Sequence, residues 1–258
     1  MLAMLLAQPL EEFDLRELRY LSSGAAPLPA ALAREFLERV PSAVIMEGYG
    51  CTETAGIISA TPPQAPRPGT VGKPVPGVEL RLVDLDGKEV PAGQPGEIVV
   101  SGPNVMNGYW GSAPEDPAAV VDGWFATGDI GILDEDGYLS IVDRKKDLII
   151  RGGHNVFPRD VEEVMLAHPA VAAAAVVGRA DERLGEEVVA FVALRPGAAA
   201  TEPELIAHAK ASLSATKYPR EVRVVEAIPL TSVGKVDRKR LREHVSGAGR
   251  DSAGWPFI

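Results

Sequence analysis

Hydrophobic and polar positions follow two different periods along this chain, and the changes of period predict its organisation. A short apolar run over 18–21 is typical of a strand, and 44–46 is typical of the next buried strand. Between them, Pro27-Leu28-Pro29 opens a segment whose apolar residues recur at helical spacing. Strand, helix, strand is the βα unit of a parallel sheet. We therefore expect part of an α/β subdomain over 1–68.

The pattern becomes strand-like after this point. Short apolar segments at 78–83, 97–100 and 139–142 are separated by turn signals that contain Gly and Pro. Short strands with this regular punctuation favour a small antiparallel barrel or sandwich. We therefore expect a β-barrel-like subdomain over 69–143.

Helical and strand periods alternate in the last part of the chain. The charged run 143–147 is a natural linker, with a hinge expected over 144–147, and the final residues 246–258 are expected to form a loose tail. The elements predicted between them are helices at 158–167 and 202–214, and strands at 171–177 and 188–194. The expected fold class is therefore α/β plus a β-barrel subdomain, followed by a small α+β C-terminal domain over 148–245.

Composition narrows the classes of function. The 258 residues carry a formal net charge of −10, which argues against a nucleic-acid surface because such a surface needs clustered Lys and Arg. A single cysteine indicates a reducing compartment. No apolar run reaches the roughly 18 residues of a membrane span. The apolar residues 1–7 lack a basic flank, so we expect a buried helix end rather than a signal peptide, in a cytoplasmic protein.

The segment Gly48-Tyr49-Gly50-Cys51-Thr52-Glu53-Thr54 follows a predicted buried strand directly. Ligands of open α/β sheets bind beyond the carboxyl ends of strands. A Thr hydroxyl can bond a phosphate oxygen, a Glu carboxylate can hold Mg²⁺, and a Tyr ring can stack on a base. The alternative is a polar turn with a capping Thr and a solvated Glu. The Cys side chain is expected to pack, because nothing basic adjoins it.

Four further segments can carry chemistry, and each also has a structural explanation. The small residues of Ser23-Gly24-Ala25-Ala26-Pro27 would let the backbone approach a flat ring, or form an ordinary strand-to-helix turn. In Thr127-Gly128-Asp129, the carboxylate can accept from both hydroxyls of a ribose, or cap a turn. The charged run 143–147 is either a solvated face or a hinge, and in the second case Gly152-Gly153 would form a ligand-contacting loop after it. Lys235 is a surface lysine, or a mobile cation brought to developing negative charge.

The order and spacing of these motifs resemble the adenylate-forming superfamily, which includes acyl-CoA and aryl-CoA ligases, luciferases and the adenylation domains of peptide synthetases. The resemblance covers roughly 18–245 and includes the Gly-Tyr-Gly-x-Thr-Glu, Gly-Glu-x-x-x-x-Gly (96–102), Thr-Gly-Asp and final Gly-Lys motifs. The segment 145–158 is most similar to the fatty acyl-CoA ligase branch, the AMP-forming acyl-CoA synthetases.

The resemblance implies two half-reactions and assigns roles to residues. A carboxylate attacks the α-phosphate of ATP to give acyl-AMP and pyrophosphate, and the thiol of coenzyme A then attacks the acyl carbonyl and releases AMP. The residues implied to border the adenine are Gly24, Ala25, Ala26 and Tyr49, and Gly50 is implied to belong to the cofactor-binding site. Those implied to act on the phosphates, the metal and the ribose are Thr52, Glu53 (Mg²⁺), Asp129 and Arg144. Those implied to act from the small domain are Lys235 on the carboxylate and α-phosphate oxygens, Lys146 as the hinge, and Gly152 and Gly153 at the pantetheine tunnel.

The sequence departs from the family pattern at one motif. A Ser/Thr/Gly-rich phosphate loop ending in Pro-Lys-Gly precedes these motifs in the family, and no segment here matches it. The resemblance is therefore to the C-terminal half of the family, and three hypotheses remain. The first is a synthetase, or its C-terminal portion, that acts on a fatty acid. The second is an adenylation domain that loads a carrier protein, and the third is a catalytically incomplete remnant that binds a nucleotide or CoA. The expected partners are a carboxylic acid, ATP, CoA and an N-terminal half, with no nucleic acid; the oligomeric state is open.

Overall fold

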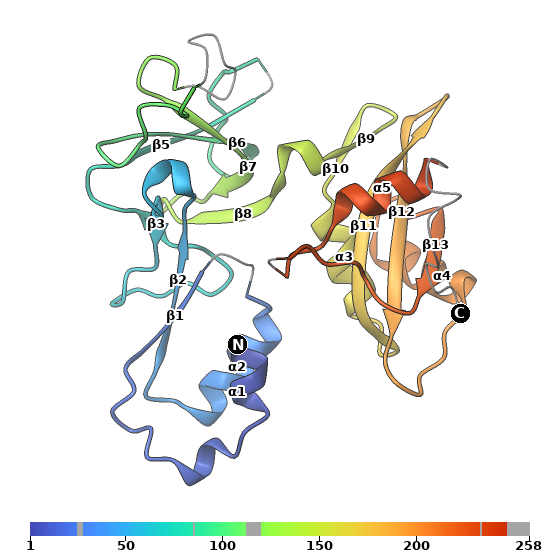
Figure 1. The fold of residues 1–258 in the computed structure, drawn as a ribbon, viewed down its shortest axis with the longest axis horizontal. Helices are drawn as coiled ribbons and strands as arrows, with labels where there is room; N and C mark the ends of the chain where they lie inside the picture. Colours follow the sequence, from blue (N-terminus) through green and yellow to red (C-terminus); the bar gives the residue numbers. More distant parts are fainter. Residues whose placement is uncertain (25–27, 85, 112–119, 233, 247–258) are drawn as a thin grey trace. The chain divides into compact units, whose positions relative to one another are not determined.

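The computed structural model describes residues 1–24, 28–84, 86–111, 120–232 and 234–246. The chain divides into two compact units, Met1–Val142 and Asp143–Ile258 (Figure 1). Residues 247–258, most of the expected tail, lie outside the described residues. None of the helices in the described ranges has the length and apolar character needed to cross a membrane.

The first unit begins with the predicted βα unit. Strands β1 (Tyr20–Ser23) and β2 (Val44–Tyr49) pair in parallel, with Tyr20 opposite Val44, and helix α2 (Ala30–Arg39) connects them. The prediction of a parallel pair is confirmed, although β1 begins two residues later than the apolar run. Two short antiparallel strands, β3 (Ser59–Ala60) and β4 (Lys73–Pro74), complete the sheet in the order β1-β2-β3-β4.

The N-terminal helix is much more exposed than the sequence suggested. Helix α1 (Leu2–Leu6) packs against α2, and only Leu6 is buried in it. Met1 and Met4 are 85% and 74% exposed, so the expectation of a buried helix end is wrong. The physical reason is that a helix of this length presents a single narrow face to its neighbour. Leu6 joins a small core that includes Phe36 and Val40 of the α2 segment.

The second sheet of the first unit is open rather than closed. Its strands follow the order β5 (Glu79–Val83), β6 (Pro95–Ser101), β7 (Phe125–Leu133) and β8 (Leu139–Arg144). A barrel requires the two edge strands to pair with each other. Here the amide of Val71 donates to the carbonyl of Leu139, and the amide of Leu139 donates to the carbonyl of Gly72, both at 2.8 Å. The expected barrel is therefore corrected to an open sheet, because β8 bonds to the 71–72 loop instead of β5.

The core of the second sheet explains why these short strands hold together. Alternate residues of β6, Ile98 and Val100, are fully buried, and Leu139 of β8 is fully buried with them. Partly buried Tyr49 and Cys51 pack against the same cluster, so the segment after β2 rests on this sheet. The two sheets of the unit thus share one apolar contact region at the position of the predicted nucleotide motif.

The second unit is a five-stranded sheet with helices on both faces. Its strands are β9 (Ile149–Arg151), β10 (His154–Val156), β11 (Val171–Asp181), β12 (Gly185–Leu194) and β13 (Glu221–Val225). Their order is β10-β9-β12-β11, with β13 parallel to β12. The helices are α3 (Pro158–Leu166), α4 (Glu202–Ser212) and α5 (Arg238–Val245). The predicted α+β arrangement is confirmed, while β9, β10, β13 and α5 were not predicted.

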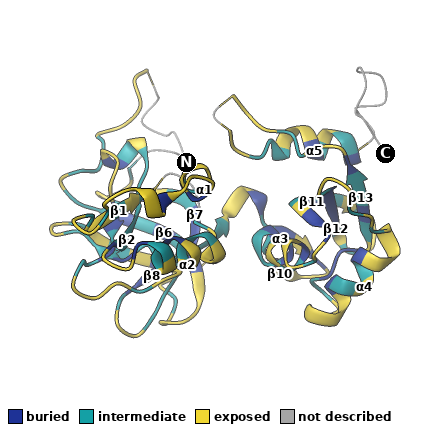
Figure 2. Cartoon of the chain, turned by 90° about the horizontal axis from the view of Figure 1, so that it is seen from below, coloured by how far each residue is buried: buried dark blue, intermediate teal, exposed yellow. Residues whose placement is uncertain are grey.

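Alternation along the central strands assigns the helices to faces. Val188, Ala190 and Val192 of β12 pack in one cluster with residues of α3 and α4. Val189 and Phe191 pack in another cluster with Leu241 and Val245 of α5. Both sets are buried because the sheet is covered on both sides, which is why β12 reads as a continuous apolar run (Figure 2).

Candidate functional site

The predicted nucleotide motif lies where two parallel strands end. Gly24 follows β1, and Tyr49 is the last residue of β2. Because β1 and β2 are parallel, their carboxyl ends meet at one edge of the sheet. The two segments are adjacent there, since a Cβ placed on Gly24 would lie 3.5 Å from the carbonyl oxygen of Gly48. Ala25 and Ala26 lie outside the described residues.

Tyr49 and Asp129 form the central contact of the site. The Tyr49 hydroxyl donates a 2.7 Å hydrogen bond to Oδ2 of Asp129, whose residue is only 8% exposed. Burial, and next the negative charge of Asp129, raise the pKa of the Tyr49 phenol well above its usual value. The phenol is therefore neutral and acts as a donor to the carboxylate throughout the physiological range.

A bulge in β7 brings Asp129 to this position. Glu97 pairs with Ile130 and Val99 pairs with Ala126, so one residue of β6 opposes three residues of β7. Gly128 stands in this bulge with a φ of +72°, a conformation that residues with a Cβ seldom adopt. The Thr127-Gly128-Asp129 motif is thus a strand bulge, and neither a turn cap nor a free loop.

The turn after β2 separates a structural threonine from an exposed one. Residues Thr52–Thr54 form one turn of 3₁₀ helix. The fully buried Thr54 accepts a 3.2 Å hydrogen bond from the amide of Cys51 and donates to the carbonyl of Cys51 at 3.1 Å. Thr54 therefore does the capping, and the Thr52 hydroxyl is left on the exposed side of the turn. The Cys51 side chain packs as predicted, and burial raises the pKa of its thiol.

Close backbone packing fixes the shape of this turn. A Cβ on Gly50 would lie 2.5 Å from the carbonyl oxygen of Gly56, so only glycine fits there. The amide of Gly56 donates to the carbonyl of Cys51 at 2.9 Å, which closes the turn. Gly50 thus allows a tight turn, and its role in cofactor binding remains a prediction.

Two residues that the sequence did not single out hold the same turn. The Asn104 side-chain amide donates to the carbonyls of Thr54 and Ile57 at 3.0 and 2.7 Å. The Tyr109 hydroxyl donates to Oε1 of Glu53 at 2.5 Å. Asn104 follows Gly102-Pro103 after β6, so a polar residue in a loop after a strand was the only signal available. Its partners lie about 50 positions earlier, which sequence spacing cannot reveal.

Glu53 is the residue predicted to hold Mg²⁺. Its carboxylate oxygens are of the type that Mg²⁺ prefers, and Mg²⁺ commonly binds through one or two carboxylates together with substrate phosphates. Within the described ranges, no group of three or more His, Cys, Asp and Glu side chains could hold a metal ion. Glu53 therefore fits a metal that arrives with a phosphate ligand, and does not fit a site built entirely from protein groups.

The remaining predicted residues lie in the second unit. Lys146 belongs to the 3₁₀ turn Lys145–Asp147, and the Arg144 amide, just before it, donates to Asp143 at 2.8 Å. Gly152 and Gly153 form the exposed turn between β9 and β10. Lys235 is exposed in a loop closed by a bridge between Leu230 and Val236.

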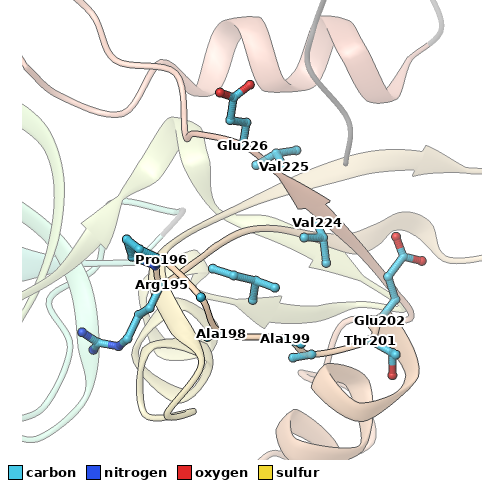
Figure 3. A pocket seen from close by; sticks show the side chains of 12 residues that line it. Arg195, Pro196, Ala198, Ala199, Thr201, Glu202, Val224, Val225 and Glu226 are labelled. Carbon is cyan, nitrogen blue, oxygen red and sulfur yellow. The ribbon is translucent and has the colours of Figure 1, made fainter.

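The second unit also has an open depression of about 540 Å³ where β12 and β13 end (Figure 3). Its walls are the loop 195–201 and residues such as Val224 and Glu226. Arg195, Glu202 and Glu226 are labelled at its rim in Figure 3, and all three are exposed. None of the predicted site residues lines this depression.

Comparison with known proteins identifies the class and then the family. The structure is similar to ATP-bound MatB from Rhodopseudomonas palustris, with a TM-score of 0.84 and 36% identity, covering 94% of this chain and 48% of that one. The fold is that of an adenylate-forming enzyme. The AMP-binding enzyme family matches residues 1–110, and the AMP-binding enzyme C-terminal domain matches 160–235. The chain belongs to this family.

Two curated relatives are similar over nearly the whole chain. A long-chain-fatty-acid–CoA ligase from Bacillus subtilis is 41% identical over 237 residues, which is 91% of this chain and 42% of that protein. A feruloyl-CoA synthase from an Amycolatopsis species is 42% identical over 232 residues, which is 89% of this chain and 47% of that protein. The chain spans about half the length of the curated relatives that it matches.

Proposed function

We propose that this chain is the C-terminal portion of an AMP-forming acid:CoA ligase. In the first half-reaction, a carboxylate oxygen of the acid bonds to the α-phosphorus of ATP, and pyrophosphate leaves with the bridging oxygen. In the second, the thiolate of coenzyme A bonds to the acyl carbon, and AMP leaves with its phosphate oxygen. Both steps are group transfers with no net oxidation.

The observation that carries this proposal is the Tyr49–Asp129 contact at the carboxyl ends of β1 and β2. A buried carboxylate held by a neutral phenol suits the two hydroxyls of a ribose, which need an acceptor that keeps its charge and orientation. The ring of Tyr49 and the backbone near Gly24 then border the adenine, with Arg144 assisting at the ribose. The exposed Thr52 hydroxyl bonds a phosphate oxygen.

Lys235 supplies the mobile positive charge of the first half-reaction. Its ammonium would lie between the acid carboxylate and the α-phosphate, where negative charge increases in the transition state. Its exposed position in a short closed loop supports this role, because the side chain is not committed to an ion pair in the described unit. Lys146 acts as the hinge, and the exposed Gly152-Gly153 turn approaches the pantetheine of CoA.

A Mg²⁺ ion accompanies ATP and is held by Glu53. When bound, the ion offsets charge on the phosphate oxygens. The Tyr109 hydroxyl holds one oxygen of this carboxylate in place, so the Glu53 side chain is oriented before the nucleotide arrives.

The acid is a fatty acid, and the site acts together with an N-terminal half in the cytoplasm. Similarity to long-chain-fatty-acid–CoA ligases from several bacteria supports the fatty acid. The equally high identity to a feruloyl-CoA synthase means that an aromatic acid is the alternative to test. The single cysteine supports a reducing compartment.

The test is ATP–pyrophosphate exchange by this chain together with an N-terminal half that carries the phosphate loop, since this exchange reports acyl-AMP formation without coenzyme A. We expect exchange that depends on a fatty acid, falls at least about 100-fold in Lys235→Ala, and is unchanged in Lys239→Ala, an exposed neighbour. A folded chain that binds AMP without exchange would instead support the nucleotide-binding remnant. Exchange equal in the two lysine variants would contradict the role of Lys235.

A further inference from the structure

Helix α5 holds the turn that contains the predicted hinge. Nη2 of Arg242 lies 2.5 Å from Oδ1 of Asp147 and 3.3 Å from the carbonyl oxygen of Lys146. The Asp147 side chain is 7% exposed, whereas that of Arg242 is 36% exposed. A carboxylate buried to this degree needs its cationic partner, because leaving it unpaired is costly. Asp147 is therefore tied to α5 although 95 positions separate it from Arg242.

A second arginine ties the start of α5 to the rest of the unit. Nη2 of Arg238 lies 2.6 Å from Oε1 of Glu162 on α3, and Nη1 lies 4.0 Å from Oδ2 of Asp147. The same Glu162 oxygen accepts a 2.9 Å hydrogen bond from the amide of Val176 on β11. Two guanidinium groups one helical turn apart thus join the turn 145–147, helix α3 and strand β11.

The loop that carries Lys235 is continuous with this arrangement. The amide of Thr231 donates to the carbonyl of Lys235 at 2.7 Å, and the amide of Lys235 is 3.2 Å from the Thr231 hydroxyl. Asp237 caps α5 by accepting from the amide of Arg240 at 3.1 Å. Arg238 is therefore three residues from Lys235, with a closed loop on one side and a capped helix on the other.

We infer that Asp147, Arg238 and Arg242 are positioning residues that join the hinge turn and the Lys235 loop into one body. A rotation at Lys146 would then move the loop with the unit and would not change the loop's own geometry. Asp143, which precedes the hinge turn, accepts a 3.0 Å hydrogen bond from the amide of Arg159 on α3, so this bond would have to break if the unit rotates at Lys146. The importance of this coupling for catalysis rests on the proposed function, whereas the coupling itself does not.

Hydrogen exchange measured by mass spectrometry on the full chain tests the coupling. In Arg242→Ala, we expect peptides spanning 143–150 and 228–237 both to exchange about tenfold faster, while peptides from β11 and β12 stay unchanged. Lys239→Ala, which removes an exposed cation from the same helix, is the matched control and should leave all four regions unchanged. Arg242→Lys should restore part of the protection, because an ammonium can still pair with Asp147.

Two outcomes would overturn the inference. One is unchanged exchange in 143–150 in a folded Arg242→Ala variant. The other is faster exchange in 143–150 alone, which would mean that the turn is held without being coupled to the Lys235 loop. If hydrogen exchange becomes faster throughout the unit in Arg242→Ala, the same measurement is made on Asp147→Asn. Exchange in β11 and β12 that rises as much as exchange in 143–150 in that variant would also contradict a positioning role. No substrate is needed, so these results stand apart from the exchange of pyrophosphate.

Discussion

The hydroxyl of Tyr49 donates a 2.7 Å hydrogen bond to Oδ2 of Asp129, although 80 positions separate the two residues. One residue ends a strand of the parallel pair, and the other stands in a bulge of the open sheet. The contact therefore joins the two sheets of the first unit at the predicted ribose position. Two motifs that are separately ambiguous in the sequence become one site through this bond.

The Tyr49 contact predicts a specific alkaline titration. Because its folded pKa is raised, the native state keeps the Tyr49 proton at pH values where the unfolded state loses it, above the ordinary value of 10.0. The contribution of this group to stability is therefore fully present below pH 10.0 and is lost as pH rises above it. Absorbance titration of native wild type and Tyr49→Phe should show the same phenolate signal near pH 10.0. A larger signal in wild type would contradict the raised pKa.

Asn104 should stabilise the turn that carries Thr52 and Glu53. Asn104→Ala removes both hydrogen bonds to the carbonyls of Thr54 and Ile57, so we expect the free energy of unfolding to fall by about 1–3 kcal/mol. Urea denaturation measures this loss. Asn107→Ala, an exposed amide three residues later, is the control and should change stability by less than about 0.5 kcal/mol. Equal effects of the two substitutions would argue against the role of Asn104.

Gly72 should tolerate no side chain, in contrast to Gly93. Both have positive φ, +79° and +82°, so alanine at either costs about 1–2 kcal/mol of backbone strain. A Cβ at Gly72 would also lie 2.0 Å from the carbonyl carbon and oxygen of Ala60, whereas nothing lies within 4 Å at Gly93. Thermal unfolding should show a loss for Gly72→Ala at least roughly twice that for Gly93→Ala. Similar losses would mean that the backbone near Ala60 can move aside.

Arg151 and Glu187 should be strongly coupled in the second unit. Their side chains are 6% and 9% exposed. Nε of Arg151 lies 2.8 Å from Oε1 of Glu187, and Nη2 of Arg151 lies 3.0 Å from Oε2. Glu187→Ala leaves a buried guanidinium unpaired, so we expect a loss of about 3–5 kcal/mol in urea denaturation. The double variant Arg151→Met, Glu187→Leu should recover part of this loss, though not all, because the carbonyl of Thr216 loses its donor. Strictly additive effects would contradict the coupling.

Periodicity predicted much of the secondary structure and little of the polar packing. Helices α2, α3 and α4 and strands β11 and β12 follow from apolar spacing, because their apolar residues recur at the helical or strand period. Strand β7 was not predicted, since Thr127-Gly128-Asp129 looks like a turn until β6 lies beside it. Helix α5 was not predicted either, because its charged residues conceal the two apolar positions that it buries, Leu241 and Val245.

The candidate site was predictable only as separate pieces. The motif residues Tyr49, Glu53 and Asp129 were recognised by their types and order, yet their partners come from distant segments. Asn104, Tyr109 and Arg242 act through contacts 47 to 96 positions away. Sequence spacing carries no information on such pairs, because they are formed by the packing of whole elements. For the same reason, the charged run at 143–147 looked solvated, although Asp147 is buried.

The most direct test of the account is AMP binding to this chain by titration calorimetry, with Asp129→Ala and the exposed carboxylate variant Glu79→Gln measured beside it. We predict micromolar binding to wild type and to Glu79→Gln, and at least about a tenfold loss of affinity in Asp129→Ala, because the ribose hydroxyls lose their charged acceptor. Binding of AMP to a folded Asp129→Ala variant as tightly as to wild type, or no binding to folded wild type, would contradict the assignment of this site to the nucleotide.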